Sequence, residues 1–291
     1  MTDKRPGITG KLGLYSKLVM LPHTVFAMPF ALTAVVLASY DYSVTTVKIL
    51  LIVVAFTGAR SAAMGFNRLI DHGVDSRNPR TRGRPLPAGK LTRLQAWLFV
   101  VASVAVFELA AWLLGPLPLL LSPFALTVVL LYSVTKFFTA ASHLVLGLAL
   151  SIAPVGAWIA VTGSFGAGVV VLAGAVLCWV AGFDVIYSLQ DEKFDRAEGL
   201  HSIPARLGTS GALWVSRVLH LAAVCLLAWS GMFFPVGVFY WIAWGAVAAM
   251  LVYEHRLVSP DDISRVDAAF FTVNGIVSVV FFLLNLVDRL V

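Results

Sequence analysis

The feature that most constrains this chain is a series of long apolar segments, each close to the length that crosses a lipid bilayer. A spanning α-helix needs about 20 apolar residues to cross the hydrocarbon core. Nine such segments occur, at residues 18–39, 47–66, 94–114, 119–135, 141–161, 166–189, 213–233, 236–255 and 267–286. The sequence therefore predicts an all-α, polytopic membrane bundle of nine transmembrane helices, formed as a single domain over residues 1–291.

Composition supports a membrane protein. Of the 291 residues, 59% are hydrophobic and only 12% are charged, whereas soluble domains are about one quarter charged. A net charge of +6 in a soluble chain would suggest nucleic acid as a partner. Here, however, Lys and Arg fall mostly between the apolar segments, where they orient the protein and contact anionic lipid. We expect membrane lipid as a partner and no nucleic acid.

The basic residues alternate between connections. Nearly all of them lie in residues 1–17, 68–93, 191–206 and 254–265 and at the Lys136 turn, while none lie in residues 40–46, 115–118, 162–165 and 231–235. The positive-inside rule therefore places the amino terminus and the long loops in the cytoplasm, and the carboxyl terminus outside. In a bacterium this is the inner membrane. Residues 1–17 are predicted as a cytoplasmic tail, and residues 68–93 and 190–211 as cytoplasmic loops.

Polar side chains recur at helical spacing at two predicted helix ends. The first acidic set comprises Asn67, Asp71 and Asp75. The second acidic set comprises Asp184, Tyr187, Asp191 and Asp195. Offsets of three, four and their sums place each set on one helix face. Because four crossings separate the two sets, both lie on the cytoplasmic side, and we expect them to face each other across a central cavity that opens there.

Carboxylates aligned on one helix face repel each other unless a cation lies among them. Carboxylate and amide oxygens are hard ligands that suit Mg²⁺ held partly by substrate phosphate. Several basic residues stand near the two sets in the sequence: Arg77, Arg80, Arg82, Arg84, Lys90, Lys136, Lys193 and Arg206. A phosphate-rich anion that arrives with Mg²⁺ fits this combination. The apolar helices around it favour an isoprenoid diphosphate.

Further polar residues lie inside the predicted helices. Arg60 lies seven residues before Asn67 on the same face, and a charge within a spanning helix normally faces a cavity or an ion-pair partner. We interpret Arg60 as a substrate-binding residue, with a structural ion pair as the alternative. We interpret Glu108, His143 and Asn274 as structural.

These residues also carry a family resemblance that covers essentially the whole chain. Residues 67–89, NRLIDHGVDSRNPRTRGRPLPAG, resemble the first signature of the UbiA-type intramembrane aromatic prenyltransferases, N-x-x-x-D-x-x-x-D followed by R-P-L-P-S/A-G. Residues 184–195 resemble the second signature, D-x-x-Y-x-x-x-D-x-x-x-D. Residues 132–139, YSVTKFFT, are similar to the family turn Y-x-x-x-K-R-x-T.

The resemblance implies roles for single residues. One Mg²⁺ would bind Asn67, Asp71 and Asp75, and a second would bind Asp191 and Asp195. Lys136 and Arg84 would contact the diphosphate, and Lys136 would also assist its departure. Asp184 and Tyr187 would lie near the acceptor or the reacting allylic carbon as catalytic residues. The implied reaction is Mg²⁺-dependent transfer of a polyprenyl group from a polyprenyl diphosphate to an aromatic acid in quinone biosynthesis, through an allylic carbocation.

Details of the sequence resemble the 4-hydroxybenzoate polyprenyltransferase branch, namely HTVFAMPF at 23–30 and GLHSIPARLG at 199–208. The acceptor stays open between 4-hydroxybenzoate and a dihydroxynaphthoate. Phe137 stands where many relatives have Arg, and the first helix offers His23 rather than an Arg. Either His23 or Arg60 would therefore bind the acceptor carboxylate, and Arg206 would help to close the loop over the diphosphate.

Two alternatives remain at this stage. A member of the same family could use another acceptor, such as a porphyrin or a lipid. A secondary transporter would also carry charges within its helices, but transporter sites usually lie near the membrane midplane at broken helices, whereas both acidic sets are predicted at one membrane face.

Overall fold

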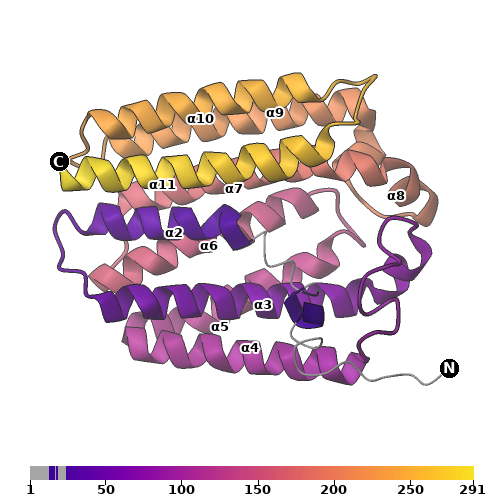
Figure 1. Ribbon diagram of the computed structural model, residues 1–291, viewed down its shortest axis with the longest axis horizontal. Coiled ribbons are helices and arrows are strands. Elements are labelled where there is room, and N and C mark those ends of the chain that lie inside the picture. The colour runs from indigo at the N-terminus through magenta and orange to yellow at the C-terminus, as the bar shows by residue number, and fades with distance from the viewer. Residues whose placement is uncertain (1–12, 17, 19–23) are drawn as a thin grey trace.

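The computed structural model describes residues 13–16, 18 and 24–291, and all regular structure in that part of the chain is helical. The long helices lie side by side with roughly parallel axes (Figure 1). They are α2 (Thr24–Ala38), α3 (Thr46–Arg77), α4 (Arg93–Leu114), α5 (Pro116–Thr135), α6 (Ser142–Thr162), α7 (Ala167–Ser188), α9 (Ile203–Gly231), α10 (Val238–Leu257) and α11 (Asn274–Leu290). Shorter elements are the 3₁₀ turn η2 (Leu189–Asp191), α8 (Glu192–Glu198) and the π-helical turn η3 (Ala268–Val273).

Each of the nine predicted segments overlaps one of the long helices. Within the described residues, seven helices are long and apolar enough to cross a membrane: Thr46–Arg77, Arg93–Leu114, Pro116–Thr135, Ser142–Thr162, Ala167–Glu198, Ile203–Gly231 and Ala268–Leu290. Helix α2 is shorter, and α10 has polar residues in its last turns. The structure confirms an all-α polytopic membrane bundle. The figure of nine crossings stays a prediction.

Helix α7 is the most enclosed of the candidate spanning helices, with 67% of its apolar window buried. It packs against α6 on one side and α9 on the other. Gly147 of α6 permits a close approach, because a Cβ atom at this position would collide with the backbone of Leu177 on α7. This tight contact fixes the positions of the pocket-lining residues on α6 and α7 relative to each other.

Two predicted helix boundaries are wrong. The predicted loop 68–93 begins too early, because α3 continues to Arg77 and includes residues 68–77. Asp71 and Asp75 lie in the last turns of the longer helix, as predicted for a helix end, and both are buried. In the predicted loop 190–211, the structure instead forms α8 and the first turns of α9. Helix α9 bends at Gly208, where φ is 69°, so the predicted helix 213–233 corresponds to the part beyond the bend.

The second acidic set does not lie on one unbroken helix, contrary to the prediction. Helix α7 ends at Ser188, η2 forms the next turn, and α8 begins at Glu192. Helix α8 in turn ends at Glu198, and the next residue, Gly199, adopts the left-handed conformation with φ 67° that an L-residue with a Cβ atom rarely takes. The chain then returns to the bundle through residues 200–202. These breaks wrap the segment around one end of α7.

Candidate active site

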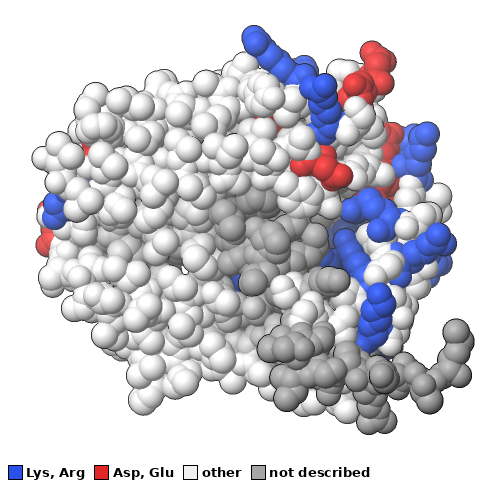
Figure 2. All heavy atoms as spheres, viewed as in Figure 1, with Lys and Arg blue, Asp and Glu red and all other residues white. Residues whose placement is uncertain are grey.

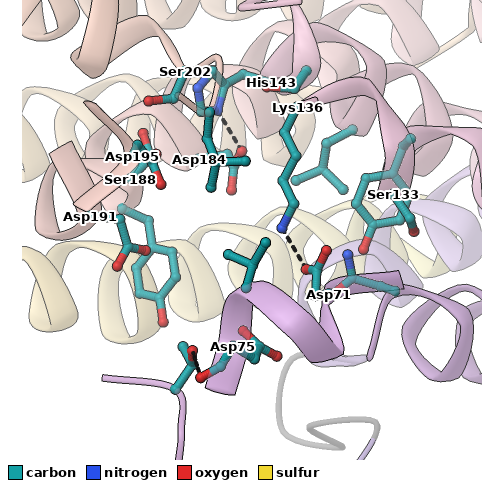
Figure 3. Close-up of a pocket in the computed structure, with 18 of the residues that line it drawn as sticks. Asp71, Asp75, Ser133, Lys136, His143, Asp184, Ser188, Asp191, Asp195 and Ser202 are labelled. Carbon is teal, nitrogen blue, oxygen red and sulfur yellow. Dashed lines mark hydrogen bonds and ion pairs between the residues drawn. The ribbon is translucent and has the colours of Figure 1, made fainter. Parts of the chain in front are cut away.

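Polar side chains from both acidic sets line one pocket of about 270 Å³. Figure 3 shows Asp71 and Asp75 on one side of it, with Asp184, Asp191 and Asp195 on the other. The wall is built from α3, residues 78–84, the Lys136 turn, the start of α6, the end of α7 and the segment 188–202. We call this space the polar pocket.

Helix α3 supplies the first acidic set and Arg60, all of which line the polar pocket. Asp71 Oδ2 lies 2.6 Å from Nζ of Lys136, and Asp75 Oδ1 lies 2.7 Å from Nη1 of Arg84. Both carboxylates are buried, where an unpaired charge would be costly. The extension of α3 beyond residue 66 is what carries these two carboxylates into the pocket.

The second acidic set faces the loop that follows α3. Asp191 Oδ1 accepts a hydrogen bond of 3.1 Å from Asn78 Nδ2 and another of 3.0 Å from Arg80 Nε. Arg80 also forms an ion pair with the other oxygen of Asp191 and donates to the hydroxyl of Tyr187 at 2.9 Å. Arg77 at the end of α3 pairs with Glu198 of α8 at 2.8 Å. These contacts bring the predicted halves of the site together.

Electrostatics favour a charged Arg80. Burial by itself would lower the pKa of its guanidinium, but the hydrogen bonds to Asp191 and Tyr187, together with the negative charge of Asp191, raise that pKa above its ordinary value. Arg80 therefore keeps its positive charge at the mouth of the second acidic set, where a phosphate oxygen would find a partner.

Three carboxylates of the pocket are thus each paired with a Lys or Arg: Asp71 with Lys136, Asp75 with Arg84 and Asp191 with Arg80. No group of three His, Cys, Asp or Glu side chains lies close enough to hold a metal ion in the part of the chain that is described. One observation nevertheless fits a hard cation. Oδ1 of Asp71 is buried and has no hydrogen-bond partner among the described residues. The donor types, carboxylate and Asn amide oxygens, are those that Mg²⁺ prefers.

The sequence led us to interpret His143 as structural, but in the structure it lines the polar pocket. Its Nδ1 atom lies 2.7 Å from Asp184 Oδ2, and the imidazole lines the polar pocket near the start of α6. Nothing in the sequence singled out Asn78, and the sequence predicted Arg80 only as one of eight nearby basic residues. Asn274, by contrast, lies away from the pocket, in the buried network that we interpreted as structural.

One described residue that was predicted to bind substrate does not line this pocket. Arg206 is exposed on α9 and does not line it. His23 lies outside the described residues. The remaining predicted residues all line the polar pocket, namely Arg60, Asn67, Asp71, Asp75, Arg84, Lys136, Asp184, Tyr187, Asp191 and Asp195.

A larger and mostly apolar cavity of about 490 Å³ adjoins the polar pocket. Its wall comes chiefly from α3, α5 and α6, with further residues from α4 and α7, and includes many Ala, Leu and Phe side chains. The two spaces share five lining residues: Arg60, Met64, Tyr132, Leu146 and Leu150. We call the second space the apolar cavity. Together they suit a ligand with a charged end and a long apolar body.

Basic side chains gather at the same end of the bundle. Figure 2 shows Lys and Arg clustered at this end, while the visible middle of the bundle carries almost none. The loop after α3 and the segment around α8 lie here, as Figure 1 shows. The polar pocket therefore lies among the most positive part of the visible surface.

Residues 27–285 match the model of the UbiA prenyltransferase family. The apo structure of a UbiA homolog from Aeropyrum pernix K1 superposes with a TM-score of 0.83 at 34% identity, covering 91% of this chain and 98% of that one. A UbiA homolog from Archaeoglobus fulgidus bound to GPP and Mg²⁺ has the same fold, with a TM-score of 0.77 at 18% identity over 96% of this chain and 100% of that one.

Curated relatives carry related names. The 4-hydroxybenzoate octaprenyltransferase of Idiomarina loihiensis is 31% identical over 68% of this chain and 70% of its own length. The mitochondrial 4-hydroxybenzoate polyprenyltransferase of Aedes aegypti is 32% identical over 70% of this chain, but the match spans only 47% of that longer protein.

Proposed function

The chain belongs to the UbiA prenyltransferase family, and from this premise we propose that it transfers a polyprenyl group from a polyprenyl diphosphate to an aromatic acid used in quinone biosynthesis. The observation that carries the proposal is the meeting of both acidic sets in one pocket beside an apolar cavity. That arrangement provides for a diphosphate at one end and a polyprenyl chain at the other. The acceptor is 4-hydroxybenzoate or a dihydroxynaphthoate.

The donor's diphosphate lies among Lys136, Arg84 and Arg80. These cations now pair with carboxylates of the pocket, and on binding they turn toward phosphate oxygens. The polyprenyl chain extends into the apolar cavity, whose Ala, Leu and Phe side chains match its hydrocarbon surface. The Archaeoglobus fulgidus homolog was solved with GPP and Mg²⁺, and we extend that ligand pair to this chain as part of the proposal.

Mg²⁺ is the proposed cofactor. Asn67, Asp71 and Asp75 would hold one ion, and Asp191 and Asp195 a second. When bound, the ions neutralise the charge that develops on the departing diphosphate. The buried, unpartnered Oδ1 atom of Asp71 supports this assignment, because a carboxylate oxygen hidden from water needs a partner.

The chain's own residues do the rest of the chemistry. Lys136 and Arg84 hold the leaving diphosphate and stabilise its negative charge as the allylic C–O bond breaks. Tyr187 stacks on Phe270 with ring centroids 4.1 Å apart, and both line the polar pocket. Their π faces stabilise the allylic cation. Asp184 orients the acceptor hydroxyl while the electron-rich ring attacks the cation, and the proton that the attacked ring carbon then loses passes to the released diphosphate.

Arg60 is the proposed partner of the acceptor carboxylate. It lines both the polar pocket and the apolar cavity, so an acid placed at their junction would be within its reach. His23 is a second candidate for this contact, and Arg206 is proposed to close the cytoplasmic loop over the donor. We also propose nine crossings, with the amino terminus and the polar pocket on the cytoplasmic side.

An aromatic acid acceptor is supported by the names of relatives that are about 30% identical. Another acceptor, such as a porphyrin or a lipid, is the alternative within the family. A transporter is disfavoured, because the carboxylates of the polar pocket come from the last turns of α3, the end of α7 and the segment up to α8. These elements lie at one end of the bundle (Figure 1) rather than near its middle.

The test is prenyl transfer by membranes that contain the protein. They receive a labelled polyprenyl diphosphate and Mg²⁺ together with 4-hydroxybenzoate or a dihydroxynaphthoate. We expect label in one of the acids, and we expect EDTA, Asp71→Ala or Asp191→Ala to lower the rate at least about 100-fold. Asp261→Asn, at an exposed position outside the pocket, is the matched control and should retain full activity. Solute uptake without label transfer to any aromatic would reject the proposal.

A further inference from the structure

His143 joins three elements at the wall of the polar pocket. It stands in the first turn of α6 and is buried. On one side, its Nδ1 atom lies 2.7 Å from Oδ2 of Asp184 on α7. On the other side, its Nε2 atom lies 3.3 Å from the backbone nitrogen of Ile203, the first residue of α9. Figure 3 shows the imidazole above Asp184 with the contact drawn.

The backbone contact determines where the proton of His143 lies. The N–H groups in the first turn of a helix have no partner within the helix, and a backbone N–H only donates. Nε2 of His143 must therefore accept from Ile203 and carries no hydrogen. A neutral imidazole then has its hydrogen on Nδ1, from where it donates to Asp184.

Asp184 thereby receives a fixed orientation. One carboxylate oxygen is occupied by His143, and among the described residues the second oxygen, Oδ1, accepts no hydrogen bond. The side chain of Asp184 is 22% exposed and lines the polar pocket. Oδ1 is the atom that remains for a substrate hydroxyl.

We propose that His143 is a positioning residue, held as the Nδ1–H tautomer by the amide of Ile203, and that it presents Asp184 to the acceptor in one orientation. This inference rests on the proposed function, since Asp184 acts there on the acceptor hydroxyl. His143 also ties Asp184 to the segment before α9, where His201 donates its backbone N–H to the carbonyl of Lys136 at 2.8 Å. A misplacement of a catalytic group by about 1 Å can cost on the order of 100-fold in rate.

Two substitutions separate the two hydrogen bonds. An Asn amide ends near the position of Nδ1, so His143→Asn retains a donor for Asp184 and loses the acceptor for Ile203. A Gln amide reaches the position of Nε2, so His143→Gln retains the acceptor for Ile203 and loses the donor for Asp184. We expect His143→Asn to keep kcat within about threefold and His143→Gln to lower it by about 10- to 100-fold, with the KM for the prenyl diphosphate unchanged in both.

A merely structural role for His143 predicts a different order. Gln is closer to His in length, and it keeps the contact to α9, so it would then be the milder change. Equal losses in the two variants, or a larger loss with Asn, would overturn the proposal. In an Asp184→Asn background, His143→Gln should cost no further activity, because the group that it positions is already absent.

A second measurement is independent of activity. The chain contains six histidines, so ¹⁵N labelling of histidine gives a simple NMR spectrum of the full-length protein in detergent or lipid. The signal that His143→Asn removes should belong to a neutral ring with hydrogen on Nδ1 and a bare Nε2. A ring with hydrogen on Nε2, or on both nitrogens, overturns the proposal whether or not the wild type transfers a prenyl group. A wild type without transfer that nevertheless shows the Nδ1–H tautomer would instead reject the proposed function.

Discussion

At the scale of single residues, the contact between Arg60 and the acceptor carboxylate is the part of the proposal that is easiest to test. It stands where the polar pocket meets the apolar cavity, and a hydrogen bond to a charged group contributes about 1.5–3 kcal/mol. We expect Arg60→Gln to raise the KM for the acid acceptor by about 10- to 100-fold, with the donor KM unchanged. The measurement is steady-state transfer with 4-hydroxybenzoate and, in parallel, its methyl ester, which lacks the carboxylate.

The ester provides the control. Wild-type protein should prefer the acid over the ester, and Arg60→Gln should lose that preference, while Arg60→Lys should keep part of it. An unchanged ratio of acid to ester in Arg60→Gln would show that another residue binds the carboxylate, and His23 would become the first candidate.

The acidic pocket residues were predictable from their repeated spacing, whereas Lys136 and Arg84 were predicted through the family resemblance. Asp71 and Asp75 stand four residues apart on one helix face, and a run of this kind is visible without a structure. His143 has no such signal, because its partner Asp184 is 41 residues away and a single His in an apolar helix is not distinctive. Asn78 and Arg80 lie in a loop, where spacing does not determine direction.

At the scale of helices, hydropathy predicted where the elements are but not where they end. Helix α3 runs on to Arg77 because its polar residues face a pocket rather than solvent. The break after Ser188 could not be predicted, because no Pro or Gly lies next to it in the sequence. The π-helical turn η3 also lies within an apolar run, where backbone hydrogen bonding rather than composition determines the geometry.

Asn274 connects η3 to two other helices. Its Nδ2 atom donates to Glu254 at 2.9 Å and to the backbone carbonyl of Ala269 at 3.0 Å, while its Oδ1 atom accepts from Trp179 Nε1 at 2.7 Å. We expect Asn274→Ala to lower the free energy of unfolding by about 2–3 kcal/mol. The substitution leaves two buried polar atoms, Oε1 of Glu254 and Nε1 of Trp179, without the hydrogen bonds that they make to Asn274. Thermal unfolding of the purified protein in detergent measures this.

A matched control stands on the same helix. Asn285 is also buried, but its Nδ2 atom makes a single hydrogen bond, to the carbonyl of Phe281 at 2.7 Å. We expect Asn285→Ala to cost about 1 kcal/mol, the net value of one ordinary hydrogen bond. A loss in Asn274→Ala no larger than that of Asn285→Ala would show that the network joining α7, α10 and η3 does not stabilise the bundle.

At the scale of the whole molecule, chain topology brings the two acidic sets together. Helices α4, α5, α6 and α7 lie between them in the chain, and this even number returns the chain to the same end. The sequence predicted that the two acidic sets lie at the same end of the bundle, because the apolar segments between them can be counted. The apolar cavity was not predictable in detail, since its shape depends on how side chains of several helices pack, and no motif encodes that packing.

The same topology gives a direct prediction for membrane orientation. Arg82 follows α3, while Ser164 joins α6 to α7, and both are exposed. Three helices separate the two positions in the chain, so they lie at opposite ends of the bundle. The basic end should face the cytoplasm, because Lys and Arg are retained on that side during insertion. Single cysteines at Arg82 and Ser164, in a background where Cys178 and Cys225 are replaced by Ser, therefore report the two membrane faces.

We expect a membrane-impermeant thiol reagent to label Ser164→Cys in intact cells and Arg82→Cys only after the membrane is opened or inverted. The reagent reaches each cysteine only from the aqueous phase. The labelling pattern therefore depends on the membrane face at which each cysteine lies and not on enzyme activity. The reverse pattern would place the polar pocket outside and contradict a cytoplasmic site. Labelling of both positions from one side would contradict an odd number of crossings between them, and with it the arrangement that lets Asp71 and Asp191 share one pocket.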